Sequence, residues 1–176
     1  MEVYCAQAGV SKRLLRDYNI PPFNLLVSFY YTRNIKDFLP HVNRLLVDSG
    51  AFTLQQKGKS TGYESYFREY KKFVKKYCNV PKITGFFELD IHEKIGYDRV
   101  REFRGELFDL TDKIIPVWHK SLGIAEFKRM CRDYDYISFS CVNDRSIKKE
   151  YYVNFICVFV FFICFLYGFL LYFNIL

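Results

Sequence analysis

The feature that most constrains the fold is an alternation of two kinds of segment that repeats between residues 25 and 142. Short apolar runs, rich in β-branched and aromatic residues, alternate with longer segments in which apolar residues recur at helical spacing. The five runs are Leu25–Tyr31, Arg44–Asp48, Ile83–Asp90, Lys113–His119 and Tyr136–Val142. Their nearly continuous apolar character is typical of strands that are buried on both faces of a parallel sheet.

The segments between these runs carry helix signals. From Ser60 to Tyr77, aromatic and aliphatic residues fall on one helical face and lysines fall on the other. Thr61 and Glu64 fit a capping box at the start of this helix, and Pro81 follows its end. Residues 97–110 and 124–132 are predicted to form two further helices. The lysine-rich face fits either an ordinary solvated surface or a surface that contacts phosphates.

Alternating strands and helices predict an α/β fold, which is either a doubly wound sheet or a (β/α) barrel. Two observations favour the barrel: no glycine-rich phosphate loop follows any strand, and most strands end in reactive side chains. Eight strands in about 250 residues are typical of such a barrel. We therefore expect residues 1–150 to form a partial (β/α)8, TIM-like barrel of about five βα units.

The first strand-end group is Asp48-Ser49-Gly50, which follows the apolar run Arg44–Asp48. A carboxylate at the carboxyl end of a barrel strand faces the mouth of the barrel, where these enzymes keep their chemistry. The alternative is that Asp48 or Ser49 only caps the following turn, because both residue types do this routinely.

The second group is the run from Glu88 to Glu93, which holds Asp90 and His92. Alternation along an extended chain would place Glu88, Asp90 and His92 on one side. Such groups at the end of an apolar strand are costly unless they are solvated, paired or used. They could bind a polar ligand or one another. A divalent metal held by Asp90, His92 and His119 would instead indicate a metal-dependent TIM-barrel hydrolase.

Two weaker groups follow the last two strands. Trp118 and His119 end one run, although a lone tryptophan also commonly fills a core. Ser140 and Asn143 bring small hydroxyl and amide groups to the end of the other.

The order LLVSFYY, LLVDSGAFT, FFELD, PVWH and YISFSCVND resembles the tRNA-guanine transglycosylase superfamily, and particularly its divergent phage and bacterial DNA-guanine transglycosylase branch. The segment VDSGAF is the most specific part. The resemblance implies a (β/α)8 barrel that exchanges guanine in tRNA or DNA for a 7-deazaguanine. It assigns Asp48 a general acid/base role and places Ser49, Gly50 and Phe52 in the base pocket. Asp90 would read the guanine edge.

The resemblance also implies that further residues contact the substrate. Trp118 and His119 lie where the family has a Gln-Gly-Gly segment, and Ser140 to Asn143 lie where it has a glycine-rich one. His92 is included among these substrate-binding residues. The nucleophilic aspartate and the zinc-binding C-x-C-x-x-C…H cluster of the family have no counterpart after Asp144. We therefore expect a truncated chain without a cofactor, and leave open whether it is active.

Charge is distributed unevenly along the chain. The protein has a formal net charge of +7, yet residues 151–176 contain no Asp, Glu, Lys or Arg. A basic body suits a nucleic-acid partner. The six cysteines form no C-x-x-C pair, and residues 1–24 lack a secretory apolar stretch, so we expect a cytoplasmic body with free thiols.

The uncharged tail has two main interpretations. Its 26 residues exceed the roughly 20 that cross a hydrocarbon core, which predicts a transmembrane helix and a membrane contact. A non-catalytic, tail-anchored membrane protein is accordingly the alternative function. The tail is also rich in Phe, Tyr, Ile, Asn and Leu, whose codons can consist of A and T alone, as in an out-of-frame extension of an A+T-rich gene.

Overall fold

The computed structural model describes residues 3–6, 21–32, 34–56 and 62–140. The chain divides into two compact units. The first unit comprises Met1–Trp118 and Leu122–Phe139, and the second comprises His119–Ser121 and Ser140–Leu176. Asn143 and the apolar tail 151–176 lie outside the described residues.

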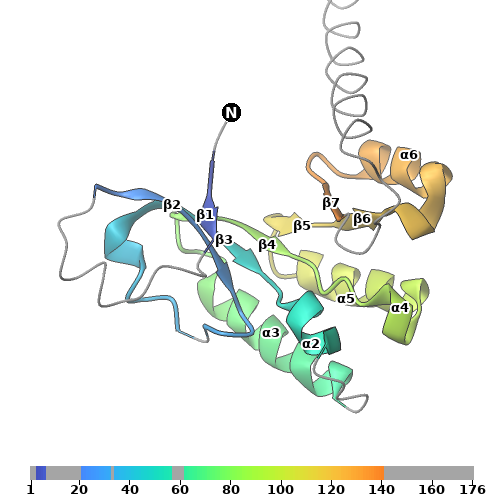
Figure 1. Ribbon diagram of the computed structural model, residues 1–176, viewed down its shortest axis with the longest axis horizontal. Helices are drawn as coiled ribbons and strands as arrows, with labels where there is room; N and C mark the ends of the chain where they lie inside the picture. The colour runs from blue at the N-terminus through green and yellow to red at the C-terminus, as the bar shows by residue number, and fades with distance from the viewer. Residues whose placement is uncertain (1–2, 7–20, 33, 57–61, 141–176) are drawn as a thin grey trace, which may run out of the picture. The chain divides into compact units, whose positions relative to one another are not determined.

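A parallel sheet of five strands forms the centre of the first unit (Figure 1). Its strands are β1 (Cys5–Ala6), β2 (Phe23–Ser28), β3 (Val42–Asp48), β4 (Ile83–Phe87) and β5 (Ile114–Ile115). Their order in the sheet is the same as their order in the chain. A separate two-stranded sheet contains β6 (Val117–His119) and β7 (Ser138–Ser140). The sheet confirms the predicted α/β class, and β1 is a strand that the sequence pattern missed.

The apolar runs explain why these segments pair. Leu25, Leu45 and Ile83 are register neighbours on β2, β3 and β4, and all three are completely buried. Leu26 and Leu46 point to the other face and are half-buried. One face of the sheet is therefore fully covered, and the other remains partly open.

Three longer helices were expected, and all three are present. They are α3 (Tyr63–Tyr77), α5 (Tyr97–Phe108) and α6 (Gly123–Asp133). Helices α3 and α5 lie on the same side of the sheet (Figure 1), and the rings of Phe67 and Phe103 stack between them with centroids 3.8 Å apart. The ring of Phe29 packs on Tyr66, Tyr70 and Phe73 of α3 at centroid distances of 5.1 to 5.3 Å.

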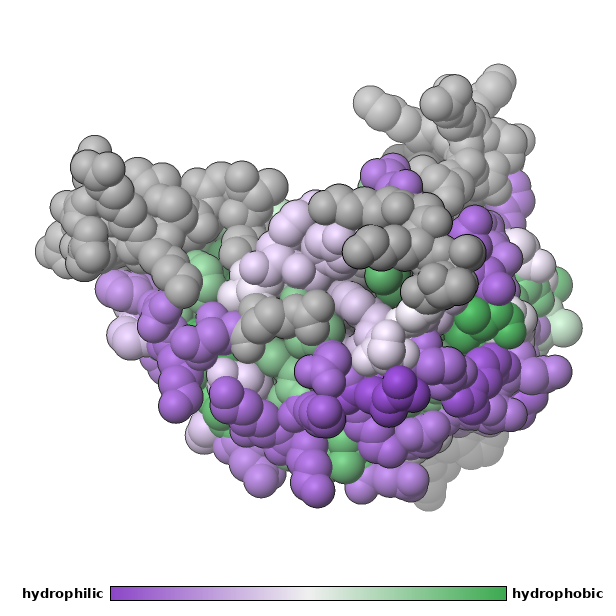
Figure 2. Space-filling view, turned by 90° about the horizontal axis from the view of Figure 1, so that it is seen from below, coloured by the Kyte–Doolittle hydropathy of each residue, from purple (hydrophilic) through white to green (hydrophobic). Residues whose placement is uncertain are grey.

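The amphipathic character of α3 is confirmed. Its aromatic and aliphatic face is buried, whereas Lys72, Lys75 and Lys76 are exposed. Figure 2 shows hydrophilic side chains over much of the molecular face that it presents. Lys71 is half-buried because its Nζ contacts Glu106 Oε2 at 2.7 Å. The lysine run thus includes one interhelical ion pair as well as solvated groups.

Some element boundaries differ from the predicted ones. The N-cap of α3 is Gly62, with no side-chain cap hydrogen bond, and Glu64 forms an ion pair with Arg99. Thr61, the other member of the predicted capping box, lies outside the described residues. The run Lys113–His119 divides at Pro116, which has no backbone N–H to donate, into β5 and β6. Four short helices complete the described structure: η2 (Leu39–His41), α2 (Ala51–Gln56), α4 (His92–Ile95) and η3 (Lys120–Leu122).

Among the described residues, no helix combines the length and the apolar composition that a membrane span requires.

Candidate functional site

The candidate site lies at the carboxyl ends of β2, β3 and β4. Asp48 is the last residue of β3 and is paired in register with Ser28, the last residue of β2. The backbone N–H of Gly50 donates to Asp48 Oδ2 over 3.0 Å. The side chain of Asp48 therefore caps the turn that follows β3, which was one of the two interpretations of this residue. It also lies at the carboxyl end of the strand, which is the end where barrel enzymes have their active sites.

The turn after Asp48 can only be built with glycine at position 50. Gly50 has a φ of +80°, and a Cβ at this position would lie 2.5 Å from Tyr30 Cβ and 2.8 Å from the Tyr66 hydroxyl. The Tyr66 hydroxyl in turn donates to the carbonyl of Ser49 over 2.6 Å. Helix α3 thus fixes the backbone immediately after Asp48, so that the carboxyl group has a defined position.

Burial is the main reason that the pKa of Asp48 lies above its usual range, because a charged carboxylate loses solvation there. The nearby carboxyl group of Asp90 raises this pKa further, whereas Ser28 and the Gly50 N–H lower it without reversing the shift. An elevated carboxyl pKa brings the protonated form closer to neutral pH. Asp48 is therefore suited to take up and release a proton.

Two buried hydroxyl groups lie in the same turn region. In the described part of the chain, Ser28 Oγ and Ser49 Oγ make no hydrogen bond of ordinary geometry. The Ser28 hydroxyl nevertheless lies close enough to Asp48 to lower its pKa. Unsatisfied buried polar atoms are uncommon in folded proteins, and they often indicate a site where a ligand or water binds.

Exposed aromatic rings lie in the segments that follow β2 and β3. Phe52 on α2 is 46% exposed, and Tyr31 is 68% exposed. The two segments meet where the Tyr31 hydroxyl lies 3.4 Å from Thr53 Oγ1. Large exposed rings beside a carboxylate can stack on a planar ligand.

Asp90 and His92 follow β4, but they do not continue it. The strand ends at Phe87, and His92 begins the short helix α4, so the alternation expected for Glu88, Asp90 and His92 fails. Asp90 is half-buried and close enough to Asp48 to influence its pKa. His92 is half-buried, and its ring meets Tyr97 edge-on with centroids 6.5 Å apart.

Glu88 belongs to a buried ion pair. The guanidinium of Arg104 donates from Nε to Glu88 Oε2 over 2.6 Å and from Nη2 to Oε1 over 3.0 Å. The backbone N–H of Val117 donates to the same Oε1 over 2.6 Å. Burial raises the pKa of Glu88, and these three donors, which favour the ionised carboxylate, lower it without reversing the shift.

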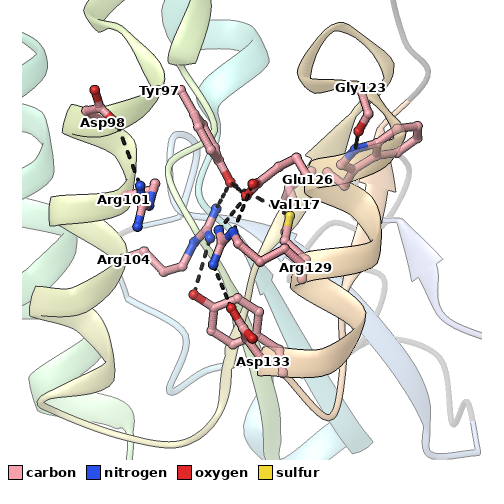
Figure 3. A network of polar contacts seen from close by, with 12 residues as sticks. Tyr97, Asp98, Arg101, Arg104, Val117, Gly123, Glu126, Arg129 and Asp133 are labelled. Carbon is pink, nitrogen blue, oxygen red and sulfur yellow. Dashed lines mark hydrogen bonds and ion pairs between the residues drawn. The ribbon is translucent and has the colours of Figure 1, made fainter.

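The ion pair extends into a network that joins α5 to α6 (Figure 3). Arg104 donates to the hydroxyls of Tyr97 at 3.2 Å and Tyr134 at 3.3 Å. The Tyr97 hydroxyl donates to Glu126, which also accepts from Arg129. Burial lowers the pKa of Arg104, but Glu88 and the two hydroxyls outweigh this effect and raise it overall. Arg104 therefore stays charged and holds the network together.

The remaining candidates among the described residues lie on β6 and β7. Trp118 is buried, donates its indole N–H to the Gly123 carbonyl over 3.0 Å and packs edge-on against Phe127, which supports the core interpretation. His119 ends β6 and Ser140 ends β7, and both belong to the second unit.

No group of three or more His, Cys, Asp or Glu side chains within the described ranges is arranged to hold a metal ion.

Three contributors to the site were not among the predicted residues: Ser28, Tyr31 and Tyr66. The segment Ser28-Phe29-Tyr30-Tyr31 follows β2 just as Asp48-Ser49-Gly50 follows β3, so its position in the repeat was a usable signal. Tyr66 carried no such signal, because its hydroxyl belongs to the apolar face of a helix.

The chain matches no protein-family model, and neither a curated protein nor a solved structure is significantly similar to it.

Proposed function

We propose that the strand ends that carry Ser28, Asp48 and Ser49, here called the Asp48 edge, bind a purine base of a polynucleotide. In this proposal the protein is a guanine transglycosylase-like enzyme that exchanges guanine for a 7-deazaguanine. The observation that carries the proposal is the proximity of Asp48, the last residue of β3, to Asp90, in the segment after β4, where Asp90 helps raise the pKa of Asp48. Guanine offers N–H donors along one edge, and ionised carboxylates accept such donors.

The roles of the two acids follow from their surroundings. Asp48 is the proton-transfer group, because burial raises its pKa and the Gly50 N–H fixes one of its oxygens. Asp90 is the acceptor for the base edge. Ser28 Oγ and Ser49 Oγ are available for further hydrogen bonds, and Phe52 offers an exposed ring for stacking. The attacking nucleophile is assigned to none of the described residues.

A partial (β/α)8 barrel is the architecture that we propose for this site. Five parallel strands follow one another in chain order without the reversal that a doubly wound sheet requires. The Tyr4 hydroxyl lies 3.2 Å from Thr84 Oγ1, although Tyr4 precedes β1 and Thr84 is on β4. Strands three places apart are separated by about 14 Å in a flat sheet, so this contact supports a sheet that curls toward its open face.

Incorporation of labelled guanine or a labelled 7-deazaguanine into tRNA and into DNA tests the proposal. We expect the full chain to exchange the base in one polynucleotide, and Asp48→Asn to lose at least about 100-fold in rate, as is typical when a general acid/base is removed. Asp98→Asn is the matched control, because Asp98 is exposed on α5. The proposal fails if neither polynucleotide is labelled, and the role of Asp48 fails if Asp48→Asn exchanges normally.

A further inference from the structure

A hollow of about 460 Å³ lies on the open face of the sheet, in the first unit, away from Asp48. Its lining includes Arg44, Thr84 and Lys113, which lie in or just before the amino-terminal halves of β3, β4 and β5. Asp48 is at the carboxyl end of β3. The hollow and the candidate active site are therefore at opposite ends of the same strands.

The floor of the hollow is apolar and closed. Leu46 on β3 and Ile115 on β5 contribute to it, and both lie against Gly85 of β4. A Cβ at Gly85 would lie 2.4 Å from Ile115 Cδ1 and 3.0 Å from Leu46 Cδ2. The two side chains thus close the floor over the glycine, and a ligand would meet aliphatic surface there instead of open backbone.

Two tyrosines also line the hollow. Tyr4 is held there by the contact between its hydroxyl and Thr84 Oγ1 at 3.2 Å. Tyr136, from the segment before β7, is 64% exposed. Aromatic side chains above an aliphatic floor favour a flat, apolar ligand, because ring faces stack without requiring a particular hydrogen-bond pattern.

Two cationic side chains line the hollow. Arg44 and Lys113 lie there together with one carboxylate, Asp112. Lys113 Nζ is fixed by donating to the carbonyls of Cys78 at 2.9 Å and Val80 at 3.4 Å. These carbonyls are neutral, so they do not cancel the positive charge of the ammonium group. Arg44 is exposed and can present a planar fork to a phosphate or carboxylate.

We infer that this hollow is a second binding site, which takes a small anion that carries a planar aromatic ring, such as a nucleoside monophosphate. Its volume lies within the range of about 300 to 1,000 Å³ that small-molecule sites occupy. The aliphatic floor and the tyrosines receive the aromatic ring, and Arg44 and Lys113 receive the anionic group. The inference does not depend on base exchange at Asp48, because the two sites share no residue named for either function.

Calorimetric titration of the full chain with adenosine 5′-monophosphate tests this site. We expect saturable binding by one molecule per chain. Adenosine, which lacks the phosphate, and inorganic phosphate, which lacks the ring, should each bind at least about tenfold more weakly, as expected when a charge-assisted contact or a ring stack is lost. 2-Naphthoate, a planar anion without ribose, distinguishes two kinds of site. Binding as tight as that of the nucleotide would indicate a general site for aromatic anions, and weaker binding would indicate a site for nucleotides. Either result supports the inference.

Variants locate the binding. Arg44→Gln should weaken nucleotide binding at least about tenfold, and Tyr136→Ala about fivefold, whereas Tyr136→Phe should bind like the wild type. Both positions are exposed, so these changes leave the core intact. Asp48→Asn should bind the nucleotide normally, which separates this site from the proposed active site. The inference is overturned if the wild type does not bind, or if Arg44→Gln and Tyr136→Ala both bind normally.

Discussion

Two clusters of ionisable side chains lie in the same unit and use charge in opposite ways. In the Glu88–Arg104 network, both carboxylate oxygens and several guanidinium donors are engaged, and both side chains are at most 2% exposed. At the Asp48 edge, burial raises the pKa of the carboxyl group, and two buried hydroxyls lack ordinary hydrogen bonds. The first cluster is complete within the chain, whereas the second leaves capacity for a ligand.

The difference shows that charged groups can serve either to stabilise the fold or to take part in chemistry. A buried ion pair with all donors satisfied gives a unique arrangement of the elements that it joins, here β4, α5 and the start of β6. Burial raises the pKa of Glu88 as well as that of Asp48. Asp48, however, lies beside two buried hydroxyls that lack ordinary hydrogen bonds, so it contributes less to the fold and is the one suited to proton transfer.

The largest effect is expected from breaking the satisfied network. Arg104→Met would leave the Glu88 carboxylate buried without its partner, and we expect the free energy of unfolding to fall by about 3 to 5 kcal/mol. Urea unfolding followed by circular dichroism measures the change. The double variant Glu88→Leu/Arg104→Met is the control, because it removes both charges and should recover much of the loss. A single variant as stable as the wild type would show that the pair does not anchor the fold.

The turn at the Asp48 edge can be broken sterically. Gly50→Ala combines a φ of +80° with a Cβ 2.5 Å from Tyr30 Cβ, so we expect a loss of about 1 to 3 kcal/mol. Gly105→Ala is the matched control on α5, where an added Cβ meets nothing within 4 Å. This control should gain about 0.5 to 1 kcal/mol, because alanine is the better helix former. Equal effects of the two substitutions on the unfolding midpoint would contradict the close packing of Gly50.

Much of this comparison could be predicted from sequence, because local pattern determines strands and long helices. The apolar runs located β2, β3 and β4, and the position of Asp48 at a strand end was correct. The partner of Glu88 could not be predicted, because Arg104 lies 16 residues away on another element. The two-residue strand β1 is too short for a periodic signal, and the positions of Asp90 and His92 depended on where β4 ends.

Removing one hydrogen bond should weaken the Asp48 turn without a steric change. Tyr66→Phe deletes the 2.6 Å bond to the Ser49 carbonyl and leaves that buried acceptor unpaired, which should cost about 1 to 2 kcal/mol. Tyr31→Phe is the control, because Tyr31 is exposed and its hydroxyl makes only a 3.4 Å contact with Thr53. Denaturant unfolding should show no change for this control. If the two variants lost equal stability, the bond to Ser49 would have no special role.

The smallest expected effect is the pH dependence that Asp48 contributes to stability, since Ser28 and the Gly50 N–H offset part of the cost of burial. The pKa of Asp48 is raised on folding, so between the ordinary value of 3.8 and the folded value the native state binds more protons than the unfolded state. Stability from this group is present below pH 3.8 and is lost as the pH rises through that window, by about 1.4 kcal/mol for each unit of difference between the two pKa values.

Asp48→Asn lacks the titration, so the wild type should lose stability relative to Asp48→Asn as the pH rises from about 3.5 to neutral. Unfolding free energies of the two proteins across this range measure the difference. A constant difference between wild type and Asp48→Asn at every pH would mean that burial does not raise the pKa of Asp48, and Asp48 would then not be suited to proton transfer near neutral pH.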